Sequence, residues 1–224
     1  MCILSGLRPA HQWHGGSNRV EIADLRALWL KAWEKADPQG PLSLYTTDPN
    51  YLATTIVWES GGRKQDVYRA MEEWFPDKEL VIMDLGCASG LTGMTLLLKG
   101  YKHCTFCDFE GIALSILREL LPEIPEFAGR YNVVAYGREV SVDVIVATDV
   151  LEHVGKHLNF LRWVGELSKE GFVLTYPFRP FEKPYEGAID GWVDDEAVEM
   201  ILRERHELLE WSTMSGGRLA VVKK

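Results

Sequence analysis

The sequence predicts an α/β fold: a doubly wound, mostly parallel seven-stranded sheet with helices on both faces, an antiparallel C-terminal strand and an N-terminal helical cap. Three observations predict it. Apolar, β-branched runs alternate with helix-like segments from Leu80 onward, the first run ends in a turn of small residues, and the chain closes on a hairpin pattern. We divide the chain into a cap, residues 1–77, and a core, residues 78–224, within one domain.

The cap is predicted to hold two helices. Residues 20–36 carry apolar side chains in steps of three and four, which is typical of one face of an amphipathic helix. A stretch rich in proline and glycine ends this helix. An aromatic and threonine-rich segment, 42–62, then leads to a second predicted helix over 64–75, which stops at Pro76.

The core alternates predicted strands and helices. Strands are predicted where apolar and β-branched residues gather, at 80–85, 103–107, 131–135, 142–147 and 171–175. Helices are predicted from apolar residues at helical spacing, over 91–99, 112–121, 158–167 and 194–204. Two further strand-like runs, 207–214 and 218–222, are joined by Ser215-Gly216-Gly217, which indicates a β-hairpin.

The bulk composition favours a globular chain that binds a small molecule. The 224 residues are 46% hydrophobic and 25% charged, and no run of about 18 apolar residues occurs. We therefore expect a cytoplasmic protein without a membrane-spanning segment. The net charge of -9 disfavours nucleic acid as a partner, because the summed field repels a phosphate backbone.

The four cysteines do not suggest a disulfide framework. Cys104 and Cys107 form a C-x-x-C pair within a predicted strand. Residues three apart on a strand point to opposite faces, so the two sulfurs should diverge. We interpret them as buried strand cysteines and not as a redox or zinc pair.

Residues 81–90, V-I-M-D-L-G-C-A-S-G, form a candidate ligand-binding motif. A strand runs into a turn of small residues that opens a helix. Such a turn lets a ligand approach the backbone, and the helix start offers N–H groups and a positive dipole end to a carboxylate or phosphate. Asp108 ends the next strand, where a carboxylate can accept both hydroxyls of a ribose, and Phe109 can lie against an adenine.

The spacing of the small residues distinguishes two nucleotide cofactors. The dinucleotide fingerprint G-x-G-x-x-G/A would place a small residue at position 91, where this chain has Leu91. The observed pattern is Gly86-x-Ala88-x-Gly90, preceded by Asp84. It resembles motif I of the class I S-adenosylmethionine-dependent methyltransferases, D-x-G-x-G-x-G, with Ala88 in place of a glycine.

The resemblance covers roughly residues 78–224. Residues 142–154, V-D-V-I-V-A-T-D-V-L-E-H-V, are similar to the fourth-strand motif of the small-molecule branch of that family, which includes the ubiquinone-type O-methyltransferases. Residues 171–177 and the terminal hairpin are similar to the family's fifth strand and its antiparallel last strand. The resemblance implies a Rossmann-like methyltransferase fold and S-adenosyl-L-methionine as cofactor.

The resemblance also implies a set of cofactor-binding residues. They surround the methionine part, the ribose, the adenine and the edge that faces the substrate: Asp84, Gly86, Cys87, Ala88, Gly90, Asp108, Phe109, Thr148 and Asp149. Two simpler roles stay open, because Asp84 can brace the turn through backbone N–H groups and Asp108 can cap a helix. The family's acidic residue after the third strand is missing, so Tyr136 or a backbone group would meet the adenine.

Asp149-x-x-Glu152-His153 is the candidate catalytic cluster. Such a cluster can hold a divalent metal or supply a base, and related enzymes carry the segment without a metal. We assign catalytic roles to His153 and Asp149, expect no metal, and interpret His157 as an exposed helix residue. We expect about half of six aromatic residues to line the acceptor pocket: Tyr45, Tyr51, Trp58, Tyr176, Phe178 and Trp192.

The expected function is in-line methyl transfer from S-adenosylmethionine to an oxygen or nitrogen of a small molecule, with the cap closing over the acceptor. Two alternatives stay open. One is an RNA methyltransferase with a metal-assisted D-x-x-E-H site, which the acidic charge disfavours. The other is a noncatalytic S-adenosylmethionine-binding module, supported by Ala88 and the short third strand.

Overall fold

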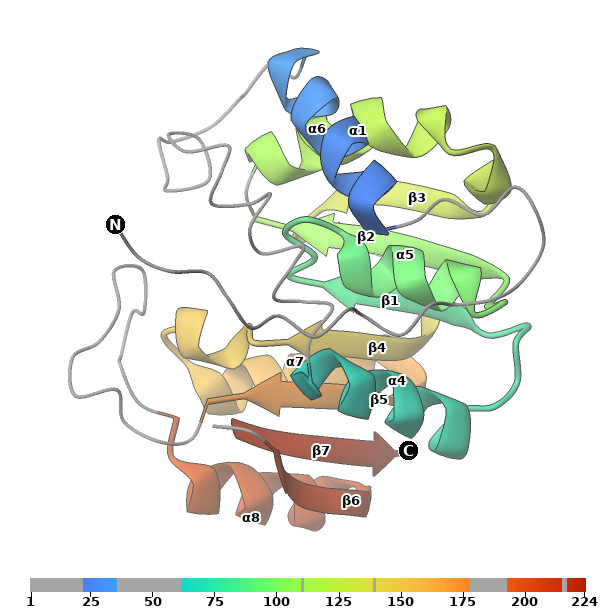
Figure 1. Ribbon diagram of the computed structural model, residues 1–224. Coiled ribbons are helices and arrows are strands. Elements are labelled where there is room, and N and C mark those ends of the chain that lie inside the picture. The colour runs from blue at the N-terminus through green and yellow to red at the C-terminus, as the bar shows by residue number, and fades with distance from the viewer. Residues whose placement is uncertain (1–21, 36–61, 110, 139, 178–192, 215–216) are drawn as a thin grey trace, which may run out of the picture.

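A computed structural model describes residues 22–35, 62–109, 111–138, 140–177, 193–214 and 217–224. Its centre is a seven-stranded sheet with the order β3-β2-β1-β4-β5-β7-β6 (Figure 1). The strands are β1 (Val81–Leu85), β2 (His103–Asp108), β3 (Tyr131–Ala135), β4 (Val142–Thr148), β5 (Ser168–Tyr176), β6 (Glu207–Met214) and β7 (Gly217–Lys223). The first five strands pair in parallel, and β7 is antiparallel to both β5 and β6. The predicted fold class is confirmed.

The helices also follow the predicted order. They are α1 (Ile22–Lys35), α4 (Gly62–Trp74), α5 (Leu91–Leu98), α6 (Gly111–Leu120), α7 (His157–Leu167) and α8 (Asp195–Arg205). Three 3-10 turns, η1 (Leu121–Glu123), η2 (Pro125–Phe127) and η3 (Leu151–His153), complete the described elements. The element ends differ from the predicted ends by a few residues, because the last hydrogen bonds of a helix or strand depend on its neighbours.

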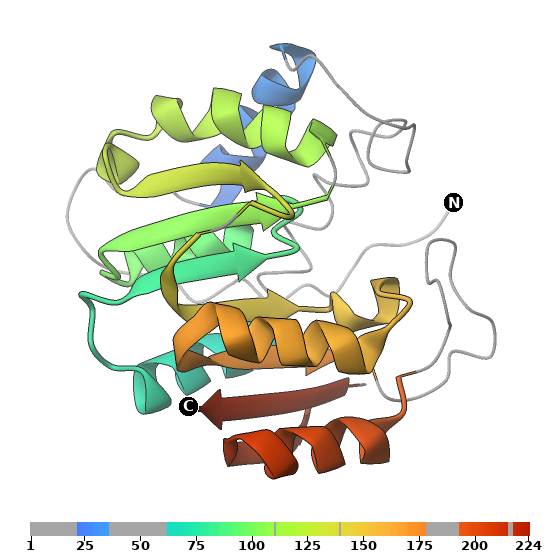
Figure 2. The same ribbon diagram turned by 180° about the vertical axis from the view of Figure 1, so that it is seen from behind.

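Alternate residues of the strands face two different helical layers. Ile82 of β1 packs with residues of α4, whereas Met83 and Leu85 pack with α7 and α8. Figure 1 shows α4 and α5 in front of the sheet, and Figure 2 shows α7 and α8 in front of its other face. Each strand of the sheet centre is apolar on both sides because both faces are covered.

The two described helices of the predicted cap are packed into these layers. Val67 and Met71 of α4 belong to the same buried cluster as Val173 of β5 and Val221 of β7. Trp29 of α1 is fully buried in the cluster that α5 and α6 form, and α1 packs against α6. The division at residue 78 stays a prediction, since residues 1–21 and 36–61 lie outside the described part.

The sheet order reverses between β1 and β4. From β1 the chain builds outward to β2 and β3, and residues 136–141 then return it to β4, on the other side of β1. Open α/β sheets bind ligands at such a reversal, beside the carboxyl ends of the strands. The carboxyl ends of β1, β2 and β4 therefore form the candidate site.

The C-x-x-C cysteines lie on opposite faces of the sheet, as their spacing predicts. Cys104 belongs to the cluster of α5 and α6, and Cys107 to the cluster of α7 and α8. Both are free and buried. Burial raises the pKa of the Cys107 thiol to about 12, so this sulfur stays protonated at neutral pH.

In the described part of the chain, every helix is too short or too polar to span a bilayer.

Candidate functional site

The turn between β1 and α5 is wound by three residues in the left-handed region. The φ angles are 68° at Gly86, 44° at Ala88 and 75° at Gly90. The amides of Gly86 and Cys87 both donate to the carbonyl oxygen of Cys107, at 2.8 and 3.1 Å. The turn is thereby fastened to the end of β2, and its backbone lies against the strand that carries Asp108.

Gly86 and Gly90 are required by packing as well as by their backbone angles. A Cβ atom at Gly86 would lie 2.4 Å from Cγ2 of Val150, and one at Gly90 would lie 2.5 Å from Cδ2 of Leu117. The sequence suggested that small residues leave room for a ligand here. In the structure, the chain itself occupies the space beside both Cα atoms, so a substitution of either glycine would disturb the fold together with the site.

Asp84 braces the turn. Its Oδ2 atom accepts a hydrogen bond of 2.9 Å from the amide of Gly93, in the first turn of α5, and only 1% of the residue is exposed. A carboxylate stabilises the positive end of a helix dipole. The N-terminus of α5 is thus held by an anion of the chain, which makes it a poor place for the carboxylate of a ligand.

Asp108 faces the same turn from β2. Its Oδ2 atom accepts a hydrogen bond of 2.8 Å from the amide of Ala88, and 7% of the residue is exposed. A carboxylate at the end of the second strand and the small-residue turn are therefore in direct contact. A ligand that reaches both would lie across the carboxyl ends of β1 and β2.

Aromatic rings extend this edge of the sheet past β2 and β3. Phe109 is 58% exposed and stacks on Tyr136, with 3.9 Å between ring centroids and 26° between planes. Tyr136 in turn lies 5.0 Å from the ring of Trp163 on α7. A phenylalanine exposed to this extent beside a ribose-binding candidate offers a flat apolar face to a nucleobase.

The residues of the candidate catalytic cluster, which follows β4, differ in backbone conformation and in exposure. Asp149 has a φ of 55°, and its Oδ1 atom accepts a 3.4 Å hydrogen bond from the hydroxyl of Thr175. In the turn η3, Glu152 is 5% exposed and His153 is partly exposed. Among the described residues, no three His, Cys, Asp or Glu side chains form a group that could hold a metal ion.

Lys64 is a candidate site residue that the sequence analysis missed. It lies in the first turn of α4 and is 7% exposed. Its Nζ donates to the hydroxyl of Thr92 on α5 at 3.2 Å and to the hydroxyl of Thr148 at the end of β4. A lysine in a polar helix start usually indicates a solvated face, and no local signal distinguishes this one.

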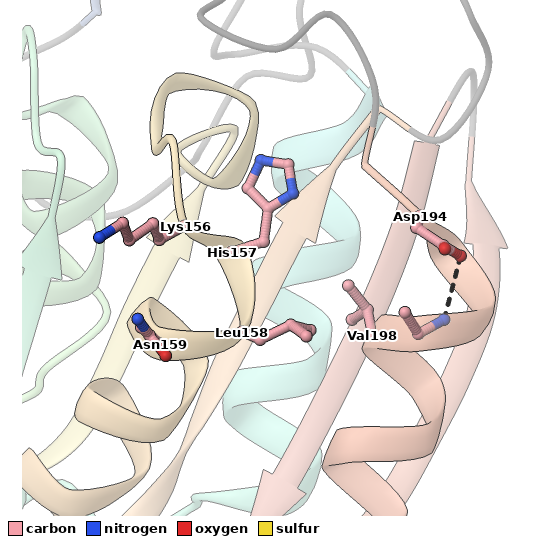
Figure 3. Close-up of a pocket in the computed structure, with 7 residues that line it drawn as sticks. Lys156, His157, Leu158, Asn159, Asp194 and Val198 are labelled. Carbon is pink, nitrogen blue, oxygen red and sulfur yellow. Dashed lines mark hydrogen bonds between the residues drawn. The ribbon is translucent and has the colours of Figure 1, made fainter.

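The structure also places Tyr176 and His157. Tyr176 is fully buried and donates a 2.7 Å hydrogen bond to Asp195, so it belongs to the core, while the other five aromatic residues lie outside the described part. His157 is partly buried. It lines a pocket of about 380 Å³ between the starts of α7 and α8 (Figure 3), together with Lys156, Leu158, Asn159, Asp194, Ala197 and Val198.

Comparisons with known proteins identify the fold. No family model matches the chain. The ribosomal protein L11 methyltransferase of Psychrobacter cryohalolentis is 25% identical over 118 residues, which are 48% of this chain and 37% of that protein. The match thus spans little more than a third of that relative.

Solved structures match a larger part of the chain than the sequence relative does. Magnesium protoporphyrin IX methyltransferase (ChlM) of Synechocystis, with bound SAH, superposes with a TM-score of 0.63 at 12% identity, over 91% of this chain and 97% of that one. The methyltransferase domain of bacterial CtHen1 gives 0.58 at 15% identity, over 72% and 97%. The protein therefore has the class I S-adenosylmethionine-dependent methyltransferase fold.

Proposed function

We propose that this protein binds S-adenosyl-L-methionine across the carboxyl ends of β1, β2 and β4 and transfers its methyl group to an oxygen or nitrogen of a small molecule. The observation that carries the proposal is the contact of Asp108 with Ala88, at 2.8 Å. It brings the ribose-binding candidate of β2 against the small-residue turn of β1. One nucleoside ligand can then meet both, at the reversal of the sheet order.

The described residues fit the three parts of this cofactor. Asp108 would accept hydroxyls of the ribose, and the exposed ring of Phe109, beside Tyr136, would cover the adenine. The turn from Gly86 through Cys87 and Ala88 to Gly90 would lie along the methionine part, with Thr148 and Asp149 on the side of the acceptor. Asp84 would act through the turn that it braces.

S-adenosylmethionine, when bound, supplies an activated methyl group on a sulfonium. The residues of the chain then need to orient the two reactants and exclude water. A base assists when the acceptor atom carries a proton, and we assign this role to His153, which is partly exposed in the turn η3 after β4.

The small-molecule acceptor is inferred from the charge of the chain and not from its fold. The acceptors named for similar proteins are a magnesium porphyrin and a ribosomal protein, so the fold does not select one class. The net charge of -9 favours a small molecule over RNA. Transfer of a labelled methyl group to a metabolite mixture, to RNA or to neither distinguishes the proposal from both alternatives.

The cofactor itself is tested by ligand-dependent stability. A ligand that binds only the native state raises the thermal midpoint by mass action. We expect S-adenosylhomocysteine (SAH) and S-adenosylmethionine to raise the midpoint of the full chain, and NAD at the same concentration to leave it unchanged. Equal stabilisation by NAD, or none by either sulfur ligand at about millimolar concentration, would refute the proposed function.

A further inference from the structure

Lys64 combines three features that each disfavour a lysine. Its side chain is buried, with 7% of the residue exposed. It lies in the first turn of α4, which holds no acidic residue, so its charge meets the positive end of its own helix. Among the described residues, no ion pair includes it. Burying a cation without an anion is costly.

The two partners of Lys64 hold the ammonium without neutralising it. Thr92 and Thr148 accept through hydroxyl oxygens, and both residues are buried. An ammonium has three N–H donors, and these two hydroxyls accept two of them. A third, anionic acceptor would complete the site and offset the buried charge.

The position of Lys64 connects it to the candidate site. Thr92 is the second residue of α5, the helix that begins after the Gly86–Gly90 turn, and Thr148 is the last residue of β4. The ammonium thus lies where α4, α5 and the end of β4 meet. Asp84 already holds the N-terminus of α5, so an anion that enters beside the turn finds its positive partner in Lys64.

We propose that Lys64 is the carboxylate-binding residue of this site: its ammonium, held by Thr92 and Thr148, binds a carboxylate of a bound ligand. The inference rests on the proposed function. Two ligands can supply the same chemistry, namely the amino-acid end of the cofactor or an acidic methyl acceptor. The residue lies outside the segment that resembles motif I and is brought there by α4.

The first arm of the test examines the cofactor. SAH and S-adenosyl-3-thiopropylamine differ in a single carboxylate, and calorimetric titration measures the affinity of each for the full chain. A hydrogen bond between charged groups corresponds to roughly a tenfold to hundredfold change in affinity. If the cofactor supplies the carboxylate, the parent prefers SAH by this factor, and Lys64→Met binds SAH no better than the analogue.

The second arm examines the acceptor. With SAH saturating, acetate is titrated against the parent and Lys64→Met, and acetamide is the neutral control of the same shape. If an acidic acceptor supplies the carboxylate, acetate raises the thermal midpoint of the parent complex, whereas acetamide does not, and Lys64→Met shows no acetate effect. Either arm, when positive, supports the proposal and identifies the source.

The thermal midpoint of the unliganded protein distinguishes a ligand-binding lysine from a purely structural one. Removing an uncompensated buried charge should leave the midpoint of Lys64→Met unchanged or raise it. Lys102→Met, at a side chain that is 65% exposed, is the matched control and should behave as the parent in both arms. The proposal is overturned if Lys64→Met binds SAH as the parent does and acetate has no Lys64-dependent effect. Failure of SAH to bind the parent would instead refute the proposed function.

Discussion

At the scale of single residues, Asp108 is central to the proposed cofactor site. The structure shows its contact with the turn through Ala88, and we propose that it also accepts from the ribose. Ala88 and Asp149 are the described residues other than glycine with positive φ, and they follow β1 and β4 on the two sides of the reversal. Backbone strain of this kind costs about 1–3 kcal/mol and gathers at functional sites. The alanine that departs from motif I is thus accommodated in a left-handed conformation.

Asp108→Ala should weaken SAH binding by roughly tenfold to a hundredfold, because hydrogen bonds to a charged acceptor are lost. Asp108→Asn should lose less, since an amide oxygen still accepts one hydrogen bond. Calorimetric titration measures both.

The control for Asp108 is a 2',3'-dideoxy analogue of SAH. It lacks the hydroxyls, so the parent and Asp108→Ala should bind it with similar affinity. If the analogue still prefers the parent by about tenfold, Asp108 acts through its bond to Ala88 and not through the ribose.

At the scale of elements, α4 is fastened to the far edge of the sheet by a polar group around Glu210. This side chain accepts from Arg69 at 2.6 Å and from the indole of Trp74 at 3.1 Å, both on α4. The hydroxyl of Ser212 donates to it at 2.8 Å. The group holds the helix that carries Lys64, so it indirectly positions the candidate site.

Acid should loosen this attachment. Burial alone would raise the pKa of Glu210, but hydrogen bonds from Arg69, Trp74 and Ser212 hold it below the ordinary value of 4.5. A depressed carboxyl pKa stabilises the native state above the unfolded pKa, and this contribution is lost as the pH falls through the folded pKa. From about pH 6 to about pH 3 the parent should therefore lose more unfolding free energy than Glu210→Gln.

Urea denaturation across this pH range measures the difference. We expect it to be about 1 kcal/mol or less, because the Arg69 side chain is 46% exposed and water screens the pair. Glu119→Gln, at an exposed position of α6, should lose as much stability as the parent. Identical pH profiles for the parent and Glu210→Gln would show that the group contributes no stability.

At the scale of the whole molecule, α1 is part of the core. The sequence analysis grouped it with a cap that closes over the acceptor, and that role stays a prediction. In the structure, Trp29 is fully buried and Ala32 is 4% exposed, both in the cluster that α5 and α6 share. Removal of α1 would expose the apolar face of α6.

A pair of truncations tests the contribution of α1. Deletion of residues 1–40 should lower the unfolding free energy relative to deletion of residues 1–20 by at least about 3–5 kcal/mol, the usual cost of losing one buried tryptophan. Trp29→Ala in the full chain should account for much of this loss. Equal midpoints for the two truncations would mean that α1 contributes little to stability.

The sequence by itself determined the order of the elements and the turn that begins the site. Periodicity and strand composition located each described helix and strand, because the pattern of apolar residues reflects which face is buried. The residues 84–90 and Asp108 stood out because a strand, a small-residue turn and a helix follow one another locally. The opposite faces of Cys104 and Cys107 followed from strand geometry alone.

Only the tertiary structure decided which distant side chains meet. Lys64 contacts Thr92 and Thr148 across 28 and 84 positions of sequence, and Phe109, just after β2, stacks on Tyr136, just after β3. Such contacts depend on the strand order and on how α4 packs against the sheet, which local periodicity does not encode. The same holds for Gly86, because Val150 occupies the space beside it only after β4 is placed next to β1.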